Sequence, residues 1–320
     1  MGAYVIRRLA YGVVVVFGVL FLLFVLFFTV TEPDDIARKA LGDKAPPEVL
    51  ETWKKNHGYD RELWPWQDWS DNLLFDHYRK MLTFDFGLSD ADDSPIIDRI
   101  RAGMGPSLSL TIPLLVLGLF VSIPLSLLVA FFRETYIDRM GVFLCVLAMS
   151  VSALLYIIGA QFLIGKVLRW YPISGFDTDL LMLPRFLALP VMVGLASGIG
   201  GDVRFYRTVF LEESSRDFVR TARAKGASEP RIMIRHVLRN ALIPVLTQVV
   251  LAIPFLFMGS ILMESFFGIP GLGSMTVDAI HANDFSTLRT MVYIGSLLFI
   301  LGQVATDLSY GLVDPRVRFE

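Results

Sequence analysis

The chain alternates long uncharged apolar runs with shorter charged segments. Five runs contain no Asp, Glu, Lys or Arg: Leu9–Thr31, Ala102–Phe132, Met140–Gly165, Asn240–Met263 and Thr290–Thr306. A sixth run, Phe186–Gly201, extends back to Leu180 across the single charge of Arg185. A helix spans the hydrocarbon core of a bilayer with about 20 apolar residues, and backbone polar groups in that core find partners only within a helix. We therefore predict an all-α polytopic membrane protein with six transmembrane helices.

The runs also divide the chain into expected parts. Residues 1–31 comprise an N-terminal tail and the first span, which exceeds the roughly 7–15-residue core of a signal peptide and is expected to be retained. Residues 32–101 form an outer segment, and residues 314–320 form a tail. Residues 102–313 form the membrane core, with spans at 102–132, 140–165, 180–201, 240–263 and 290–313 and a loop at 202–239.

Basic residues in the short loops indicate the orientation of the chain. If the chain crosses the membrane six times, the tails and loops on one side hold 15 Lys and Arg, nine of them in 202–239. The short loops on the opposite side hold four. Short cytoplasmic loops carry the excess of positive charge in membrane proteins. We therefore expect both termini and the loop 202–239 in the cytoplasm, and residues 32–101 outside the membrane.

The outer segment is acidic and shows helical patterning. Between residues 31 and 101 it carries ten basic and sixteen acidic side chains. Pro46-Pro47 opens an expected helix over 48–56 and Gly58 ends it, because proline suits the first turn of a helix and glycine the position after the last. Apolar side chains between Trp66 and Leu82 recur near helical spacing. We predict a small helical subdomain, which either caps the bundle or helps to dock an external partner.

Composition narrows the chemistry that the chain can perform. It is 54% hydrophobic with a mean hydropathy of +0.57, and its net charge of −2 gives no reason to expect a nucleic-acid partner. The single cysteine, Cys145, excludes a disulfide framework or a thiolate metal cluster within the chain. No two of the four histidines are spaced as ligands on one helical turn, so no metal is expected. The phosphate-binding pattern Gly-x-x-x-x-Gly-Lys-Ser/Thr is missing from the sequence, so any ATP must bind to another subunit.

The loop 202–239 is the most informative segment, since its basic sequence reads as helix, turn, helix. Ala222 and Ala224 favour the first helix, and Gly226 permits the turn that ends it. Ser228 is a candidate N-cap, and Pro230 suits the first turn of the second helix. Two basic helices joined by a turn of small residues suit a plug that enters a cleft on a soluble partner. Alternatively, the arginines bind anionic lipid headgroups.

This loop resembles the coupling loop of ABC importer membrane subunits, with Thr221-Ala222 and Gly226 at the Ala-Ala and Gly positions. It is similar in particular to the dipeptide, oligopeptide and nickel permease family, although Phe218 replaces that family's tyrosine. Further resemblances follow in the family's order along nearly the whole chain, at residues 4–9, 84–89, 107–110, 235–244, 264–273 and 314–318. The residues to which the likeness assigns coupling are Arg220, Thr221, Ala222, Ala224, Lys225, Gly226, Ser228 and Arg231.

The resemblance implies the ABC importer type I permease fold and a division of labour among subunits. This chain would be a non-catalytic permease subunit in the inner membrane of a bacterial cell, without a cofactor of its own. Its expected partners, besides the lipid bilayer, are a second, homologous permease, two cytoplasmic ATPase subunits that bind ATP and Mg, and an extracytoplasmic solute-binding protein. The expected cargo is a peptide or a similar small solute.

The sequence departs from the family pattern in two places. Ser150–Leu154 lacks the proline of the family's Ser-x-Pro-x-Phe element, and Glu32–Asp35 replaces its usual Pro-Gly-Asp-Pro. Both differences lie near the expected path of the solute or its mouth. They bear on the identity of the cargo, which the sequence leaves open between peptides, nickel chelates and other solutes.

Two carboxylates lie near the ends of expected spans, Glu264 near the outer interface and Asp307 near the inner one. Ionisable groups inside a membrane are costly and are therefore candidates for function. Either each carboxylate pairs with a neighbouring group in a structural role, or the two act in gating or along the path of the solute.

Two other classes of membrane protein would also use several spans. An ion-coupled secondary transporter, the main alternative, carries ionisable groups at mid-helix and paired broken helices, whereas the runs here have almost no central charge. An intramembrane hydrolase needs a nucleophile and a base at bilayer depth, whereas all four histidines lie outside the uncharged runs. The pattern therefore favours the permease.

Overall fold

The computed structural model describes residues 2–30, 33–42, 44–64 and 72–313, which form helices and loops without a strand. The predicted all-α class is therefore confirmed. The expected tail at 314–320, with its resemblance to the family, and the outer residue Trp66 lie outside the described residues.

Five helices are long and apolar enough to cross a membrane. They are α1 (Gly2–Phe24) with its π-helical continuation η1 (Val25–Val30), α5 (Ile96–Phe131), α8 (Leu183–Ser214), the run of α10 (Glu229–Ile232), η3 (Met233–Val237) and α11 (Leu238–Met258), and α14 (Phe285–Val313). Large apolar side chains remain exposed along them, such as Phe120 at 76% and Val14 at 68%. Apolar surface of this extent marks a protein that contacts lipid or partners, in agreement with the predicted polytopic membrane protein.

The third apolar run is bent, in contrast to the straight span expected over 140–165. It forms α6 (Tyr136–Ser150), α7 (Ala153–Ala160) and the π-helical η2 (Gln161–Val167). The two halves differ in direction by 85°. Between them Val151 is extended, and the Ser152 side chain caps α7 by accepting a hydrogen bond from the Leu155 N–H at 3.4 Å. The cap restarts the helix in a new direction, within the segment that lacks the family's proline.

Several helices begin earlier or end later than the apolar runs predict. α5 begins at Ile96 and α14 at Phe285, and α8 continues to Ser214, well past the end expected at residue 201. Hydropathy detects only the part of a helix that lies in the hydrocarbon core, so it does not detect the polar ends of the same helix. Where the fifth span was expected to continue to residue 263, α11 ends at Met258 and two short helices follow: α12 (Ile261–Phe267) and α13 (Leu272–His281).

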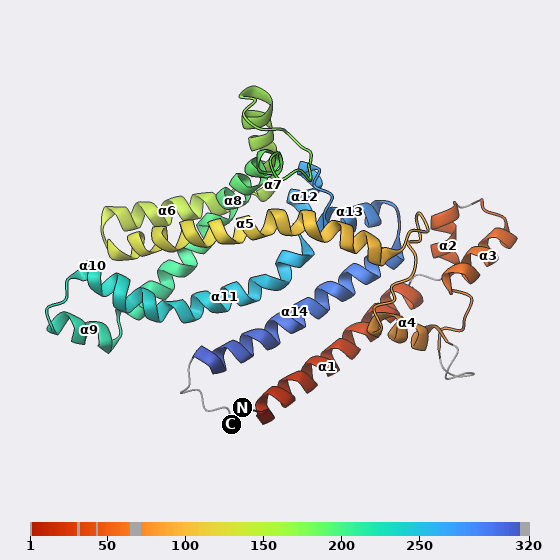
Figure 1. Cartoon of the computed structure of the whole chain (residues 1–320), viewed down its shortest axis with the longest axis horizontal. Coiled ribbons are helices and arrows are strands. Elements are labelled where there is room, and N and C mark those ends of the chain that lie inside the picture. The colour runs from red at the N-terminus through yellow and green to blue at the C-terminus, as the bar shows by residue number, and fades with distance from the viewer. Residues whose placement is uncertain (1, 31–32, 43, 65–71, 314–320) are drawn as a thin grey trace.

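The membrane helices pack in pairs that the sequence order does not reveal. α5 and α6 both contact α8, while α14 lies between α11 and α1 (Figure 1). Close approach of α6 and α8 depends on Gly200, because a Cβ there would lie 2.6 Å from the carbonyl oxygen of Cys145. The first and last described helices thus run side by side, with the start of α1 and the end of α14 at the same end of the bundle.

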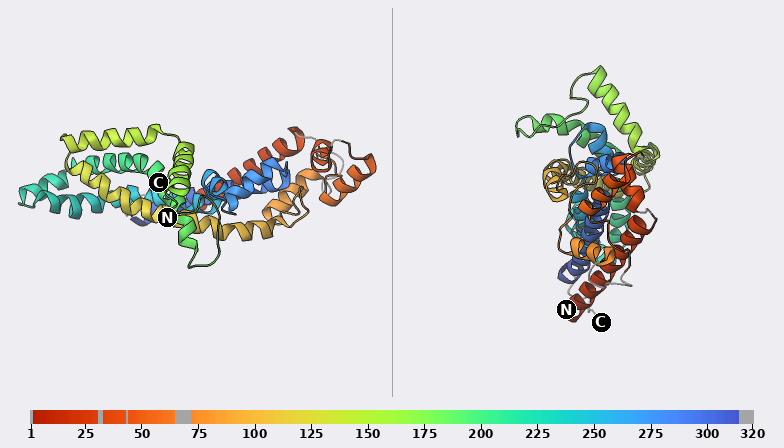
Figure 2. Two further views of the ribbon diagram at one scale, coloured as in Figure 1. Left: turned by 90° about the horizontal axis from the view of Figure 1, so that it is seen from above. Right: turned by 90° about the vertical axis from the view of Figure 1, so that its right-hand side faces the viewer.

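The outer segment folds as a small helical subdomain of α2 (Pro33–Leu41), α3 (Pro47–His57) and α4 (Leu73–Leu82). The predicted helix and its glycine stop are confirmed, since α3 starts at Pro47 and Gly58 follows it with φ +74°. Viewed from above, this subdomain and the region of α9 (Asp217–Ala224) and α10 lie at opposite ends of the molecule (Figure 2). The subdomain packs on the end of α1, where His77 Nε2 donates a hydrogen bond to the Leu20 carbonyl at 3.1 Å.

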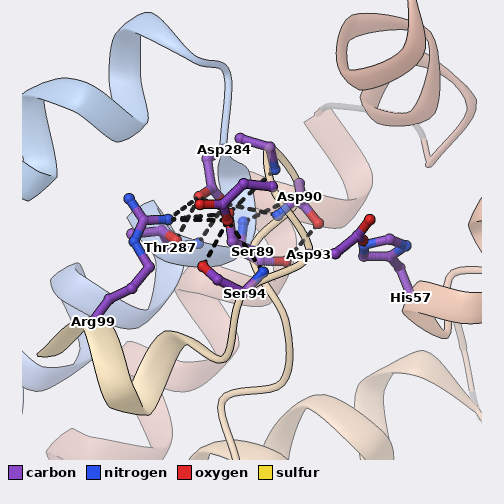
Figure 3. Close-up of polar contacts among 11 residues, drawn as sticks. His57, Ser89, Asp90, Asp93, Ser94, Arg99, Asp284 and Thr287 are labelled. Atoms are coloured by element: carbon purple, nitrogen blue, oxygen red, sulfur yellow. Dashed lines mark hydrogen bonds and ion pairs between the residues drawn. The ribbon is translucent and has the colours of Figure 1, made fainter.

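A buried polar network joins the start of α14 to the segment before α5 (Figure 3). Its centre is Asp284, which is 1% exposed. The Asp284 carboxylate accepts hydrogen bonds from Ser89 Oγ at 2.6 Å and from Arg99 Nη1 at 3.1 Å. It also accepts from the N–H and Oγ1 of Thr287 at 3.0 and 2.6 Å, and from the Asp90 N–H at 3.1 Å. Five donors thus satisfy one buried carboxylate.

A second buried carboxylate, Asp90, extends this network into the outer subdomain. It accepts hydrogen bonds from the N–H and Oγ of Ser286 at 2.7 and 2.9 Å, and Tyr59 OH lies 3.5 Å from its Oδ1. Burial raises the pKa of Asp90, opposed by the Ser286 hydrogen bonds and by the charge of Arg289. Burial likewise raises the pKa of Tyr59 to about 12. The outer subdomain is therefore tied to the membrane helices through groups withdrawn from water.

Candidate functional site

The predicted coupling segment forms the helix–turn–helix that its sequence indicates. α8 ends at Ser214, α9 covers Asp217–Ala224, and α10 continues through η3 into α11. Gly226 forms the turn with φ +79°, in the left-handed region that favours glycine. Ser228 takes the extended backbone of an N-cap, but its side chain makes no capping hydrogen bond. Pro230 lies in the first turn of α10, where a backbone N–H would have no partner within the helix, so its missing N–H costs no hydrogen bond.

The segment buries its apolar side against its own chain. Val219 of α9 and Val237 of η3 are 2% and 0% exposed, and they pack with Tyr206 and Phe210 of α8. Ala222 is part of the same core at 7% exposure, so it supports this packing and cannot present itself to a partner. The other candidate residues remain on the surface: Arg220, Thr221, Ala224, Lys225, Gly226, Ser228 and Arg231.

Acidic residues of the same segment pair with several of its arginines. Arg223 binds Glu229 across the turn, with Nε and Nη2 at 2.6 and 3.1 Å from the two carboxylate oxygens. Arg220 Nη1 lies 3.5 Å from Asp217. These pairs are largely exposed, so each contributes at most about 1 kcal/mol to stability. The Arg223–Glu229 pair braces the turn, while Lys225 and Arg231 make no ion pair among the described residues.

A cavity of about 420 Å³ lies between α5, α8 and α11. Most of its wall is small or apolar, including Gly118, Gly198 and Ala252. It extends from Ser260, just after α11, to Tyr206 in the C-terminal half of α8. A concave face of small apolar residues that runs along three membrane helices can form one wall of a passage.

Two polar side chains in this cavity escaped the sequence analysis. Asp202 of α8 is the only Asp, Glu, Lys or Arg among the described lining residues, and Gln248 of α11 also lines the cavity. Asp202 had been assigned to the cytoplasmic loop, because the uncharged run ends at Gly201. The helical period offered a signal, since Gly194, Gly198 and Asp202 recur at four-residue spacing along one helix face.

Glu264 is fully buried and binds four donors. Its Oε1 accepts from Ser107 Oγ at 2.8 Å and from the Ser260 N–H at 3.0 Å, and its Oε2 accepts from the N–H groups of Gly273 and Ser274 at 2.7 and 3.1 Å. The carboxylate therefore binds the N-terminal N–H groups of α13 and holds that helix to α5, as such groups favour an anion. A Cβ on Gly273 would lie 3.0 Å from this carboxylate. These contacts match the structural-pairing alternative, while a gating role stays a prediction.

Asp307 also has a partner, since its Oδ2 lies 3.2 Å from Arg8 Nη1. The pair joins α14 to α1 near the chain ends, and both side chains are partly exposed. Asp307 does not line the cavity between α5, α8 and α11. Its contact is again that of the pairing alternative, and a role in the path is an untested prediction.

No group of three or more His, Cys, Asp and Glu side chains that could hold a metal ion occurs in the part of the chain that the structure describes. The candidate site therefore consists of an exposed basic helix–turn–helix and an apolar cavity with one carboxylate.

Comparison with known proteins covers the whole chain. The sequence profile described as the binding-protein-dependent transport system inner membrane component matches residues 107–319, and the profile of its N-terminal part matches residues 1–111. The chain is 33% identical over 321 residues to the glutathione transport system permease protein GsiC of Shigella flexneri serotype 5b, covering 99% of both chains. It is 32% identical to the proteins of that name from Escherichia coli strain K12 and Salmonella typhimurium strain LT2, again with 99% of both chains covered.

Proposed function

This chain belongs to the family of binding-protein-dependent transport system inner membrane components, and from that premise we propose that its α5–α8–α11 cavity forms half of the path of a peptide-like solute. As a member, it is a non-catalytic permease subunit of an ABC importer in the dipeptide, oligopeptide and nickel class. It works with a solute-binding protein and with ATPase subunits. The cavity carries the proposal, because small and apolar residues of three membrane helices line its volume of about 420 Å³.

The proposed assembly contains this chain, one homologous permease, two cytoplasmic ATPase subunits with bound ATP and Mg, and an external solute-binding protein. The second permease would close the open side of the cavity. ATP binding would draw the ATPases together, and the turn around Gly226 would transmit this motion. Since α9 and η3 pack on α8, displacement of the turn moves a helix that lines the cavity.

The proposed cargo is a small peptide or a peptide-like solute. The GsiC relatives are glutathione permeases by name, and glutathione is itself a small peptide. Asp202 would favour a protonated amine on the cargo, because a carboxylate in an apolar surrounding attracts a cation more strongly than one in water. Asp202→Asn should therefore reduce transport of amine-bearing peptides more than transport of the same peptides with an acetylated amino group.

The proposed path is tested by filling the cavity. Ala252→Trp should abolish transport by the reconstituted complex while the subunits still assemble and hydrolyse ATP. Leu147→Trp is the matched control, since this residue is 52% exposed on α6 and lines no described cavity. Normal transport with Ala252→Trp would refute the path, and loss of assembly with the control would show that bulk anywhere is harmful.

The proposed orientation puts both termini and the α9–α10 turn in the cytoplasm and the outer subdomain outside. Ser228→Cys and Thr52→Cys are suitable reporters, because both positions are exposed. Ser89 is unsuitable as an outer reporter, since it is buried in the polar network. A membrane-impermeant thiol reagent applied to intact cells should label the cysteine at 52 alone. Labelling at 228 would reverse the orientation.

A further inference from the structure

Three buried side chains from three different elements leave a nitrogen without a hydrogen-bond partner, and all three line one small cavity. The atoms are His57 Nε2 at the end of α3, His77 Nδ1 in α4 and Arg289 Nε in α14. The cavity has a volume of about 20 Å³. Buried polar groups in proteins nearly always have a partner, so the convergence of three such atoms on one space calls for a ligand.

The hydrogen bonds made by the other ring nitrogens fix what His77 and His57 can do. His77 Nε2 faces the Leu20 carbonyl at 3.1 Å, and a carbonyl only accepts, so Nε2 carries the proton. Burial lowers the pKa of His77 to about 3, so the ring is neutral and Nδ1 is an acceptor. In the same way His57 Nδ1 donates to the Trp53 carbonyl at 3.0 Å, which makes Nε2 an acceptor in the neutral ring.

The third atom, Arg289 Nε, is a donor only. The guanidinium lies over the ring of Phe28, 4.6 Å from its centroid, and the residue is 9% exposed. Its charge needs no anion in the cavity, because it interacts electrostatically with the carboxylate of Asp90. The three unpartnered nitrogens therefore present one donor and two acceptors to the cavity, whose lining also includes Tyr59 and the ion pair of Lys80 with Asp76 at 2.8 Å.

We propose that this cavity binds one water molecule, which accepts a hydrogen bond from Arg289 Nε and donates to His77 Nδ1 and to His57 Nε2. A cavity needs roughly 10–15 Å³ of such space to hold a water, and a buried water makes about three hydrogen bonds. A lone anion or metal cation would face side chains of both charges, since Arg289 and Lys80 are cationic and Asp76 is anionic, whereas a water molecule can both accept and donate. The Asp93 carboxylate lies 3.2 Å from His57 Nε2 but is not aligned for a hydrogen bond.

The water connects elements that carry different parts of the molecule. α3 and α4 belong to the outer subdomain, and α14 is a membrane helix in contact with α1 and α11. Each of the three unpartnered nitrogens would destabilise this junction if it were buried without a hydrogen bond. The water thus completes the joint between the subdomain and the bundle, beside the carboxylate network.

Hydroxyl-radical footprinting of the full chain in its assembled complex tests the proposal without a mutation. A radical formed from a bound water oxidises the methionine beside it even where bulk solvent does not reach. Met81 lines the cavity and is 1% exposed, whereas Met291 is 3% exposed and lines no described cavity. Met81 should be oxidised severalfold faster than Met291, and ¹⁸O-labelled solvent water should appear in its sulfoxide after equilibration.

A variant and a direct observation complete the test. His77→Phe removes the acceptor and adds bulk, so it should bring the oxidation of Met81 down to the rate of Met291. An experimental density map that resolves ordered water should show one peak within about 3.2 Å of the three nitrogens. Equal oxidation of the two methionines in the unmodified chain, or a map of that quality without the peak, would overturn the proposal.

Discussion

The α9–α10 turn and the junction around Asp284 both pair arginines with carboxylates, but in opposite ways. At the turn, Arg223 and Glu229 meet in a pair in which both side chains are more than half exposed. At the junction, the Asp284 side chain is 1% exposed and binds five donors from four residues. Exposure decides the difference, because water competes with an exposed pair and does not compete with a buried one.

The comparison indicates which end of the molecule can change its contacts. An exposed pair costs little to break and remake, so a surface built from such pairs suits a partner that is engaged and released in each transport cycle. A buried network loses several kcal/mol when a member is removed, so it suits a joint that stays closed. We therefore expect the outer subdomain to move with α1 and α14, and the α9–α10 turn to be the segment that exchanges partners.

The largest effect is expected from Asp284→Ala. The substitution leaves Arg99 and several hydroxyl and N–H groups without their acceptor in a buried site, which costs about 3–5 kcal/mol. Thermal unfolding of the detergent-solubilised protein should show a large loss of stability, with reduced amounts in the membrane. Asp98→Ala is the control, since the Asp98 side chain is 67% exposed and should change stability little. Equal losses in the two variants would remove the distinction between buried and exposed pairs.

Gly226→Asp should come next, with its effect on transport and not on insertion. A non-glycine residue at its φ of +79° costs about 1 kcal/mol. A side chain there adds no steric cost, because no atom beyond its chain neighbours lies within 4 Å of the position of its Cβ. A negative charge at the tip of a basic turn should block docking to the ATPase, so cargo-stimulated ATP hydrolysis and transport should be lost.

Gly226→Asn separates charge from shape at the same position. Asparagine has nearly the same size as aspartate and tolerates the left-handed region, so it should retain more transport than Gly226→Asp. Normal transport by Gly226→Asp, at a normal level in the membrane, would contradict the coupling role of this turn.

The pH dependence of stability provides a smaller effect at the outer end. The folded-state pKa of His77 is lowered to about 3 by burial and by the charge of Arg289, from an ordinary value of 6.5. The unfolded chain therefore takes up a proton that the folded chain refuses as pH falls below 6.5, and stability is lost by about 1.4 kcal/mol per pH unit. His77→Gln cannot titrate, so its thermal midpoint should fall less than that of the unmodified protein between pH 6.5 and 5. Parallel pH profiles would contradict this assignment.

The smallest effect on stability is expected from Arg220→Glu. Its partner Asp217 is exposed, and exposed pairs contribute at most about 1 kcal/mol. Docking should weaken because charge complementarity is lost. A charge at the rim of a contact mainly affects the association rate, whereas groups at its buried centre mainly affect dissociation. Transport should therefore fall less than with Gly226→Asp, and the deficit should be larger at low ionic strength, where repulsion between the reversed charge and an acidic partner surface is screened less. A loss of stability like that of Asp284→Ala would show that the turn is as rigid as the junction.

The α9–α10 turn could be predicted from the sequence, whereas the junction around Asp284 could not. The turn depends on residues close together in the chain, and Ala224, Gly226 and Pro230 determine it through helix propensity, positive φ and the first-turn preference of proline. The junction depends on Ser89, Asp90 and Asp284, which are distant in sequence, and no local pattern indicates that they meet. The same distinction explains why Asp202 was assigned to a loop, since the end of an uncharged run does not mark the end of a helix.

The sequence by itself determined the membrane class, the number of apolar runs, the helix–turn–helix of 216–239 and the family, because each depends on composition or on local spacing. Only the tertiary structure decided that Ala222 faces inward, that Glu264 and Asp307 have partners, and that the third apolar run bends by 85° at Val151 and Ser152. It also decided which three helices enclose the cavity. These features arise where segments distant in the chain compete for the same space and the same hydrogen bonds, and a pattern along one segment carries no information about its neighbours.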